Sequence, residues 1–316
     1  MSWLFSGPHR DEVALLADAD RLLTGRPPGR LGRDELRAAT AAHGCDLATA
    51  MACRAAQGEP ANAAFLAALA ALPLTADAQV GRGQRLLLVP TMYHRERPEL
   101  GGDGRLIAEI AARLGFTVET AAVASLGAIA PNAAVLADHL RGWARPGWVV
   151  SLSKGTADLK RALLVEPGLA ARVAGWISLA GMPGGTPLAD PRPGRPIAHA
   201  LLGAWLRLRG ADGGMLPEMG REHAFSRAAL ALPAGLPTVD VVPMPLACHL
   251  RRPVARSAAW LARSGPNDGY VLLEDACIAP GHLVPLWGAD HYLRTPELPP
   301  LLYRLLRWAA GQRRAG

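Results

Sequence analysis

Short apolar runs alternate with helical patterns over most of the chain after residue 84. The runs are aliphatic and β-branched and end at turn residues, which is typical of strands buried on both faces of a sheet. They occupy residues 85–90, 117–123, 147–152, 174–181, 236–242 and 282–288. Segments with helical spacing follow most of them. Strands that alternate with helices predict an α/β fold, with a mostly parallel, doubly wound sheet covered by helices on both sides.

Two regions depart from this alternation. Residues 10–73 contain only helical patterns, separated by Gly and Pro, and on the first of these helices Val13, Leu16, Ala17 and Leu22 are expected near one face. Residues 182–236 are rich in Gly and Pro around one helix-like stretch. We therefore expect an N-terminal helical segment over residues 1–80, a main domain over 81–316, and an insertion at 182–236 within that domain.

Composition narrows the class of protein. The 316 residues are 50% hydrophobic and 19% charged, as in an ordinary globular protein, and the net charge is +7. The basic residues are nearly all Arg and are spread along the chain beside Ala, Gly and Pro, so no basic patch for nucleic acid is expected. No apolar stretch reaches the roughly 18 residues that a membrane span needs, and residues 1–16 do not resemble a signal peptide. These features predict a soluble, cytoplasmic protein.

The cysteines give no evidence of a metal site. Cys45, Cys53, Cys248 and Cys277 form no C-x-x-C pair and no ordered spacing with His. Zinc sites usually show such spacing, so we expect no metal and unpaired thiols in a reducing compartment.

Two overlapping motifs occur in the stretch GWVVSLSKGTADLKRAL, residues 147–163. Ser151 and Lys154 have the S-x-x-K spacing of penicillin-binding proteins, in which the first serine is the nucleophile. Ser153 lies at the centre of a near match to G-x-S-x-G, with Ser151 in place of the first glycine and Gly155 as the second. The predicted strand–turn–helix context favours Ser153, because an S-x-x-K serine begins a helix and Ser151 lies inside the strand. A third interpretation is that Ser153 only caps the helix that follows.

A serine hydroxyl needs a general base and a carboxylate that orients the base. His291 follows the last predicted strand, so it should lie on the same sheet edge as the loop after residues 147–152. For the acid, Asp268 in the turn GPNDG ranks first, followed by Asp275 and then Asp240. Asp290, next to the histidine, is expected to point away or to anchor its loop.

The segments VVSLSKG, GPNDG and LWGADHYL, in the chain order Ser, Asp, His, resemble the α/β-hydrolase superfamily, and within it the bacterial lipase and esterase-like serine hydrolases. The resemblance covers residues 85–312. It implies an oxyanion hole formed by two backbone N–H groups, one from Lys154 and one from the loop after residues 85–89. Pro90-Thr91-Met92 stands where these enzymes often have His-Gly-X, so Met92 is the expected second donor, with Tyr93 as the alternative.

The resemblance also gives the insertion 182–236 the position of a lid. Tyr93, Trp205 and Met215 are then expected to bind the substrate, with Met219 and Phe225 as further candidates for an acyl pocket, although such residues more often form core packing. The implied activity is hydrolysis of a carboxylic ester or thioester by a Ser153–His291–Asp268 triad, without cofactor, on a small acyl substrate. Two alternatives stay open: a hydrolase-like protein without catalytic activity that binds a ligand or partner, and an S-x-x-K acyl-enzyme that uses Ser151.

Overall fold

The computed structural model describes residues 12–191, 196–278 and 281–312. The expectation about a signal peptide depends partly on residues 1–11, which lie outside these ranges. The described chain contains one six-stranded sheet in the order β2-β1-β3-β4-β5-β6, with every pair parallel, so the predicted parallel sheet is confirmed. The strands are β1 Arg85–Val89, β2 Thr117–Thr120, β3 Gly147–Leu152, β4 Val173–Leu179, β5 Thr238–Met244 and β6 His282–Trp287.

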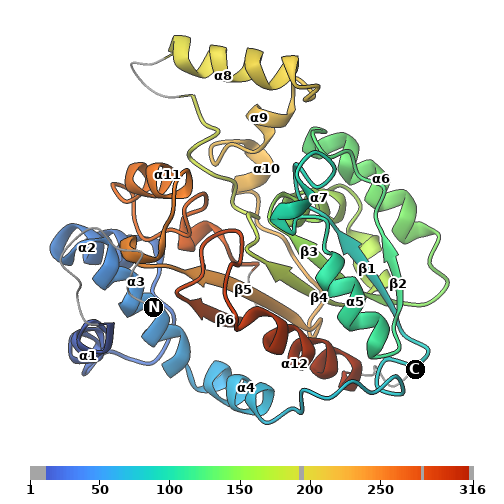
Figure 1. The fold of residues 1–316 in the computed structure, drawn as a ribbon, viewed down its shortest axis with the longest axis horizontal. Coiled ribbons are helices and arrows are strands. Elements are labelled where there is room, and N and C mark those ends of the chain that lie inside the picture. Colours follow the sequence, from blue (N-terminus) through green and yellow to red (C-terminus); the bar gives the residue numbers. More distant parts are fainter. Residues whose placement is uncertain (1–11, 192–195, 279–280, 313–316) are drawn as a thin grey trace.

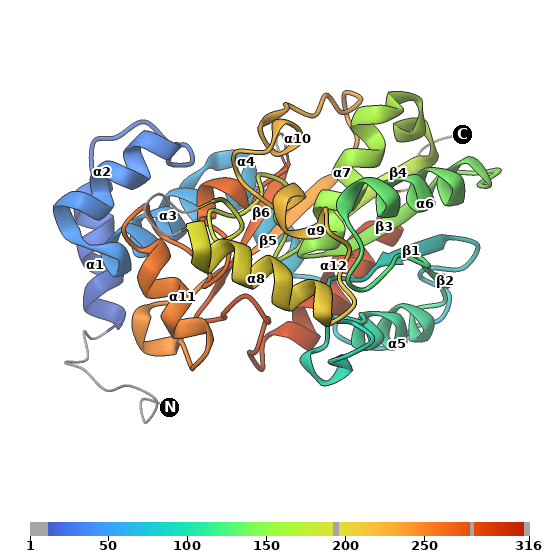
Figure 2. The same ribbon diagram turned by 90° about the horizontal axis from the view of Figure 1, so that it is seen from above.

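Helices surround the sheet. The α-helices are α1 Glu12–Leu23, α2 Arg33–His43, α3 Cys45–Gly58, α4 Pro60–Ala70, α5 Arg105–Arg113, α6 Ile129–Arg141, α7 Lys154–Val165, α8 Pro196–Leu208, α9 Met215–Glu218, α10 Ala224–Arg227, α11 Val254–Leu261 and α12 Leu298–Gly311. Short 3₁₀ turns are η1 Pro98–Leu100, η2 Pro167–Arg172, η3 Ala247–His249 and η4 Leu273–Asp275. Helices α5 and α12 lie on one side of the sheet and α6 and α7 on the other (Figures 1 and 2).

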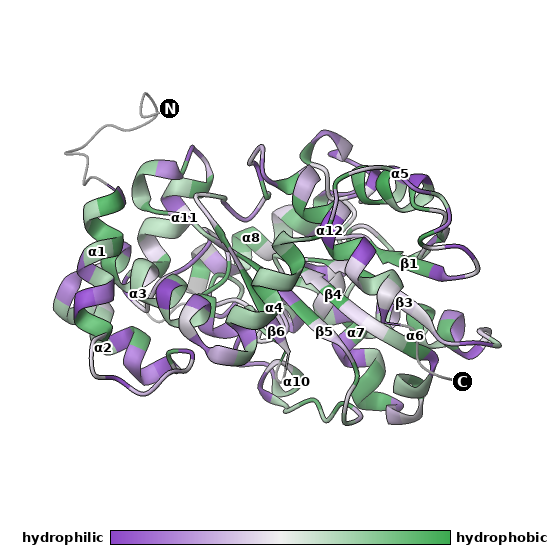
Figure 3. Cartoon of the chain, turned by 90° about the horizontal axis from the view of Figure 1, so that it is seen from below, coloured by the Kyte–Doolittle hydropathy of each residue, from purple (hydrophilic) through white to green (hydrophobic). Residues whose placement is uncertain are grey.

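The apolar strands supply a core on each face of the sheet, because side chains alternate along a strand. In β1, Leu86 and Leu88 pack in one cluster with α5 and α12, whereas Leu87 and Val89 pack in another with α6 and α7. In Figure 3 the strands in the middle of the molecule are mostly green to white, and the purple, hydrophilic positions lie mainly on the surrounding helices and loops. Burial on both faces is what places the strand ends, and the loops that follow them, in a fixed arrangement.

The N-terminal helices α1–α4 pack along the β5–β6 side of the sheet (Figure 1). Asn62 on α4 bonds to the free backbone edge of β6: its Nδ2 donates to Leu283 O at 2.8 Å, and its Oδ1 accepts from Leu283 N–H at 2.9 Å. Leu47 and Ala50 of α3 share a small apolar cluster with Leu246, which follows β5. The helical segment thus supplies polar and apolar contacts to the edge of the sheet.

The orientation of α1 differs from the expectation. Leu15 and Ala19 are its buried residues, whereas Val13 is 73% exposed and Leu22 is 44% exposed. Leu15 and Ala19 pack against α3 in the cluster near Leu246. A short helix with apolar residues on several sides does not specify its buried face, so the packing partner determines it.

The insertion 182–236 connects β4 to β5 and contains α8, α9 and α10. Figure 1 shows α8 at one extremity of the molecule, beyond α9 and α10. Several apolar side chains of α8 are exposed, including Ile197, Leu201 and Trp205, whereas Met215 of α9 is buried. Within the described residues, no helix has the length and apolar character needed to cross a bilayer.

Candidate active site

Ser153 lies at the tight turn between β3 and α7. Its backbone has φ 44° and ψ −113°, an unfavourable conformation for a residue with a side chain. Residue 155 must be glycine for the turn to close, because a Cβ there would lie 2.6 Å from Val89 O and 2.8 Å from Pro90 O. The turn therefore brings the start of α7 against the end of β1 and projects the Ser153 side chain from the carboxyl end of the sheet.

The structure brings Ser153, His291 and Asp268 into one hydrogen-bonded chain. Ser153 Oγ lies 2.8 Å from His291 Nε2, and His291 Nδ1 lies 2.7 Å from Asp268 Oδ2. The serine and histidine come from loops that follow β3 and β6, so their side chains meet at the same sheet edge although 138 positions separate them. This arrangement provides a hydroxyl, a base within bonding distance, and a carboxylate that orients the base.

Asp268 is held rigidly. Its carboxyl group is fully buried, and Oδ1 accepts the backbone N–H groups of Tyr270 at 2.9 Å and Val271 at 2.8 Å. The backbone of the same residue accepts the His291 N–H at 3.0 Å. The turn string GPNDG thus folds around the carboxylate, and one oxygen is left to face the imidazole.

The environment of His291 raises its pKa. Burial alone lowers the pKa by disfavouring the imidazolium, but the charge of the Asp268 carboxylate and its hydrogen bond outweigh that effect, and Asp290 adds to them. The net result is an imidazole with a pKa above its ordinary value. Such a group is a stronger proton acceptor than a free histidine.

The three other aspartates considered from the sequence form hydrogen bonds or ion pairs with groups other than His291. Asp275 is ion-paired with Arg33 and Arg221. Asp240 is buried in β5 and accepts the Ile278 N–H at 2.9 Å. Asp290 pairs with Arg294 and accepts the Tyr292 N–H, so it anchors the loop that carries the histidine, as the sequence suggested. Of the acids considered from the sequence, Asp268 is the one bonded to His291.

The S-x-x-K pair is not assembled for catalysis. Ser151 is fully buried within β3, where its Oγ accepts the Trp176 Nε1–H at 2.8 Å and bonds to Thr156 Oγ1 at 2.8 Å. The Lys154 ammonium is directed to Asp158, with Nζ–Oδ distances of 2.8 and 3.1 Å. The geometry therefore favours Ser153 as the reactive hydroxyl.

The loop after β1 meets the start of α7 through Thr91. The Lys154 N–H donates to Thr91 Oγ1 at 3.2 Å, and the Thr91 N–H donates to Gly102 O at 3.1 Å. Within the described part of the chain, no hydrogen bond is found for the Met92 N–H. Of the two N–H groups expected for an oxyanion hole, that of Lys154 is therefore bonded to the Thr91 hydroxyl and that of Met92 is available as a donor.

The sequence did not indicate a buried polar network next to Ser153. Lys154 and Asp158 form an ion pair that is about 1–2% exposed, and Asn132 Nδ2 donates to Asp158 Oδ2 at 3.0 Å. Asn132 also bonds both the N–H and the C=O of Ala124 in the loop after β2. The spacing Lys154-x-x-x-Asp158 was the available signal, since residues four apart share one face of a helix. The Thr91 hydroxyl had no comparable signal.

The residues expected to bind substrate are distributed unevenly. Met215 is buried in an apolar cluster with Met219 and Phe225, and Tyr93 packs against that cluster as a partly buried residue. Trp205, by contrast, is 47% exposed on α8, with the Arg209 guanidinium 5.1 Å from its ring centre. Tyr93 and Met215 therefore share an apolar region that adjoins the loop after β1, and Trp205 does not belong to it.

Among the described residues, one group of potential metal ligands contains none of Ser153, His291 and Asp268. Glu12, Cys248 and His249 place ligand atoms within 4.8 Å of one another. However, the Glu12 carboxylate bonds to His249 Nε2 and accepts the Trp287 Nε1–H, while His249 Nδ1 accepts the Leu246 N–H. These hydrogen bonds account for the grouping as a contact between α1 and the sheet.

Comparison with solved structures finds proteins with a similar fold. The chain is similar to the metagenomic carboxyl esterase MGS0156, with 22% identity and a TM-score of 0.56 over 73% of this chain and 76% of that chain. It is also similar to the mature lipase BlEst2 of Bacillus licheniformis, with 18% identity and a TM-score of 0.52 over 69% of this chain and 91% of that chain. No protein-family model and no curated protein sequence matches the chain.

These similarities define the class of structure. The all-parallel sheet, the strand–turn–helix at Ser153 and the similar solved structures together show that the chain has the α/β-hydrolase fold. The resemblance inferred from VVSLSKG, GPNDG and LWGADHYL is thus confirmed at the level of the fold.

Proposed function

We propose that this chain is a serine hydrolase that cleaves carboxylic esters or thioesters through an acyl-enzyme on Ser153. The observation that carries the proposal is the continuous chain of hydrogen bonds from Ser153 Oγ through His291 to Asp268. The solved structures with the same fold bear the names carboxyl esterase and lipase, which supports the same class of reaction.

In the first half-reaction, Ser153 Oγ attacks the substrate carbonyl carbon while His291 Nε2 takes the hydroxyl proton. The negative charge moves to the carbonyl oxygen, where the Lys154 and Met92 N–H groups are available to stabilise it. The intermediate then expels the alcohol or thiol, which receives the proton from the imidazolium. Asp268 keeps the ring oriented and stabilises its charged form.

In the second half-reaction, His291 removes a proton from water, and the resulting oxygen nucleophile attacks the acyl carbon. Collapse of this intermediate breaks the bond to Ser153 Oγ and returns the proton to it. The products are a carboxylic acid and the restored hydroxyl. No other reactant is needed. The apolar cluster that includes Met215 and Tyr93 favours an apolar acyl group.

A fluorophosphonate probe tests the proposal, because it phosphonylates only an activated serine. We expect labelling of the purified protein to map to Ser153 and to disappear in Ser153→Ala and in His291→Ala. Ser151→Ala is the matched control, since it removes a neighbouring hydroxyl that is buried in the strand. Labelling at Ser151 would instead indicate an S-x-x-K enzyme.

Nitrophenyl esters and acyl thioesters of graded chain length then identify the substrate class. Turnover that is lost in the Ser153 and His291 variants supports the proposed hydrolase. A folded protein that takes up no probe and hydrolyses no member of the panel would be a binding protein without catalytic activity, and the proposal would be wrong.

A further inference from the structure

A cavity of about 330 Å³ lies beside α7. Its walls come from α7, from residues 183–184 after β4, from residues 221–230 of the insertion, from residues 274–278, and from Arg33 of α2. None of Ser153, His291 and Asp268 lines it. The cavity is therefore a separate space, in the volume range of small-molecule sites.

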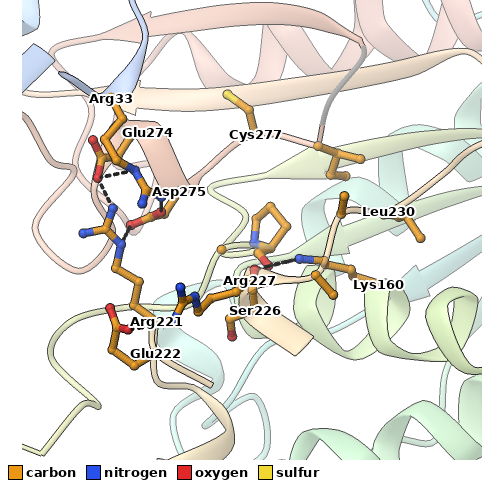
Figure 4. Close-up of a pocket in the computed structure, with 15 residues that line it drawn as sticks. Arg33, Lys160, Arg221, Glu222, Ser226, Arg227, Leu230, Glu274, Asp275 and Cys277 are labelled. Atoms are coloured by element: carbon orange, nitrogen blue, oxygen red, sulfur yellow. Dashed lines mark hydrogen bonds and ion pairs between the residues drawn. The ribbon is translucent and has the colours of Figure 1, made fainter. Parts of the chain in front are cut away.

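One wall of the cavity consists of arginine and carboxylate side chains that are ion-paired with one another. Figure 4 shows Arg33, Arg221, Glu274 and Asp275 gathered on one side. Arg33 Nε lies 3.2 Å from Glu274 Oε1, and the Arg221 side chain contacts both carboxylates, with Nε 2.9 Å from Asp275 Oδ2. Glu274 and Asp275 thus both have arginine partners, and neither forms an ion pair with Lys160.

Lys160 lies on the opposite side of the cavity, beside Leu230 (Figure 4). Its side chain is buried, and Nζ donates to the carbonyl oxygens of Pro183 at 2.8 Å and Ser226 at 2.9 Å. Among the described residues, Lys160 forms no ion pair and no third hydrogen bond, although an ammonium has three N–H donors. Burial lowers the pKa of this lysine to about 8, and the charge of Asp275 only partly opposes that effect.

A buried ammonium without a carboxylate partner is unfavourable unless something else compensates its charge. Part of the remaining lining is apolar and consists of Pro183, Ala228, Ala229, Leu230 and Ile278. Glu222, Ser226, Arg227 and Cys277 supply polar groups to the same lining, and Arg227 is ion-paired with Glu222. The site therefore combines a buried ammonium, which has no ion-pair partner and one unused donor, with a short hydrocarbon surface.

We propose that this cavity binds a small aliphatic monocarboxylate, whose carboxylate accepts the free N–H of Lys160 and whose hydrocarbon part lies against Leu230 and Ile278. A single negative charge matches this ammonium. The binding does not depend on Ser153 chemistry, so it can be tested even if the proposed hydrolase activity is absent.

The test is isothermal titration calorimetry of the full chain with sodium hexanoate, with 1-hexanol as the uncharged ligand of equal chain length. We expect one binding event for hexanoate and at least about tenfold weaker binding of hexanol, because the hydroxyl can accept the ammonium N–H but has no negative charge to pair with it. Lys160→Met keeps the length of the side chain but removes the charge, and it is expected to weaken hexanoate binding by about tenfold or more. The affinity for hexanol should change less in this variant.

A second variant locates the site without touching the lysine. Ala228→Phe introduces a ring into the apolar part of the cavity and leaves the hydrogen bonds of Lys160 in place, so it should abolish hexanoate binding even if Lys160→Met does not fold. Hexanoate binding that persists in Ala228→Phe, or hexanol binding as tight as hexanoate binding, would overturn the proposal. Complete absence of hexanoate binding to the unmodified protein would do the same.

Discussion

The backbone N–H of Lys154 donates a hydrogen bond to the hydroxyl oxygen of Thr91 at 3.2 Å. This bond joins the residue after the candidate nucleophile to the loop after β1, and it occupies the very donor that an oxyanion would need. In the proposed mechanism, a substrate oxygen that took that place would lie next to the Thr91 hydroxyl, which could rotate to donate to it. We therefore expect Thr91 to assist the oxyanion in addition to the backbone donors.

The hydroxyl of Thr91 can be removed with little change of shape. We expect Thr91→Val to lower kcat for an ester substrate by about tenfold to a hundredfold with a smaller change in KM, because a donor to the oxyanion acts mainly in the transition state. Thr91→Ser keeps the hydroxyl and should retain most of the activity. Equal kcat values in the valine and serine variants would show that the hydroxyl has no such role.

The Asp268 carboxylate should be essential for turnover and dispensable for the fold of the sheet. Asp268→Asn removes the charge that orients His291, and we expect kcat to fall by about three to four orders of magnitude. Asp275→Asn is the comparison, because that carboxylate belongs to the arginine cluster. Steady-state kinetics on circular-dichroism-matched samples provide the measurement. Activity that survives in Asp268→Asn and vanishes in Asp275→Asn would contradict the assignment of the acid.

The pH dependence of labelling should report the pKa of His291. The base must be neutral to accept the serine proton, so reactivity rises as the pH rises through this pKa. Because Asp268 raises the pKa, the midpoint should lie above the ordinary histidine value of about 6.5. In Asp268→Asn the burial effect remains without the carboxylate, and the midpoint should move to lower pH. Fluorophosphonate labelling rates across pH test both shifts, and a midpoint that stays in place would argue against the coupling.

The Lys154–Asp158 ion pair is nearly inaccessible to solvent, so breaking it on one side leaves an unpaired buried charge. Lys154→Met and Asp158→Asn should each lower the free energy of unfolding, with Lys154→Met costing about 3–5 kcal/mol. The double variant Lys154→Met/Asp158→Asn removes both charges and should recover much of that loss. Urea denaturation measures all three, and strictly additive effects would show that the two side chains are not coupled.

Gly155 permits the closest approach in the turn. In Gly155→Ala the new methyl group would meet the carbonyl oxygens of Val89 and Pro90, so the start of α7 must shift. We expect a clear loss of thermal stability together with a loss of probe labelling at Ser153. Gly168→Ala is the matched control, because an added Cβ at that exposed glycine meets no atom within 4 Å. Comparable losses in the two variants would mean that steric contact at the turn is not the cause.

The parts of the structure that depend on local pattern were predictable. The apolar runs marked the strands, and the strand–turn–helix around Ser153 together with His291 after the last strand was sufficient to infer a common sheet edge. The turn GPNDG identified Asp268 as a loop carboxylate. In each case the information lies within a few neighbouring residues or in the rule that parallel strands end at one edge.

Contacts between distant segments were not predictable in the same way. Asp275 was ranked as a possible triad acid because it follows a loop, but its partners Arg33 and Arg221 lie more than 50 positions away in the chain. The buried face of α1 likewise depends on α3. No local pattern indicates that Lys160 lacks a counter-charge, since that property depends on where carboxylates from other segments are directed.

The two hydrogen bonds between Asn62 and Leu283 give α4 a role that its alanine-rich sequence conceals. They satisfy both backbone groups of one residue on the edge strand β6, which would otherwise offer a template for pairing with another chain. In a shortened protein that starts after α4, the edge of β6 would be exposed. We expect such a protein to self-associate, whether or not it is active. Helix α4 thus protects an edge of the sheet from pairing with another chain.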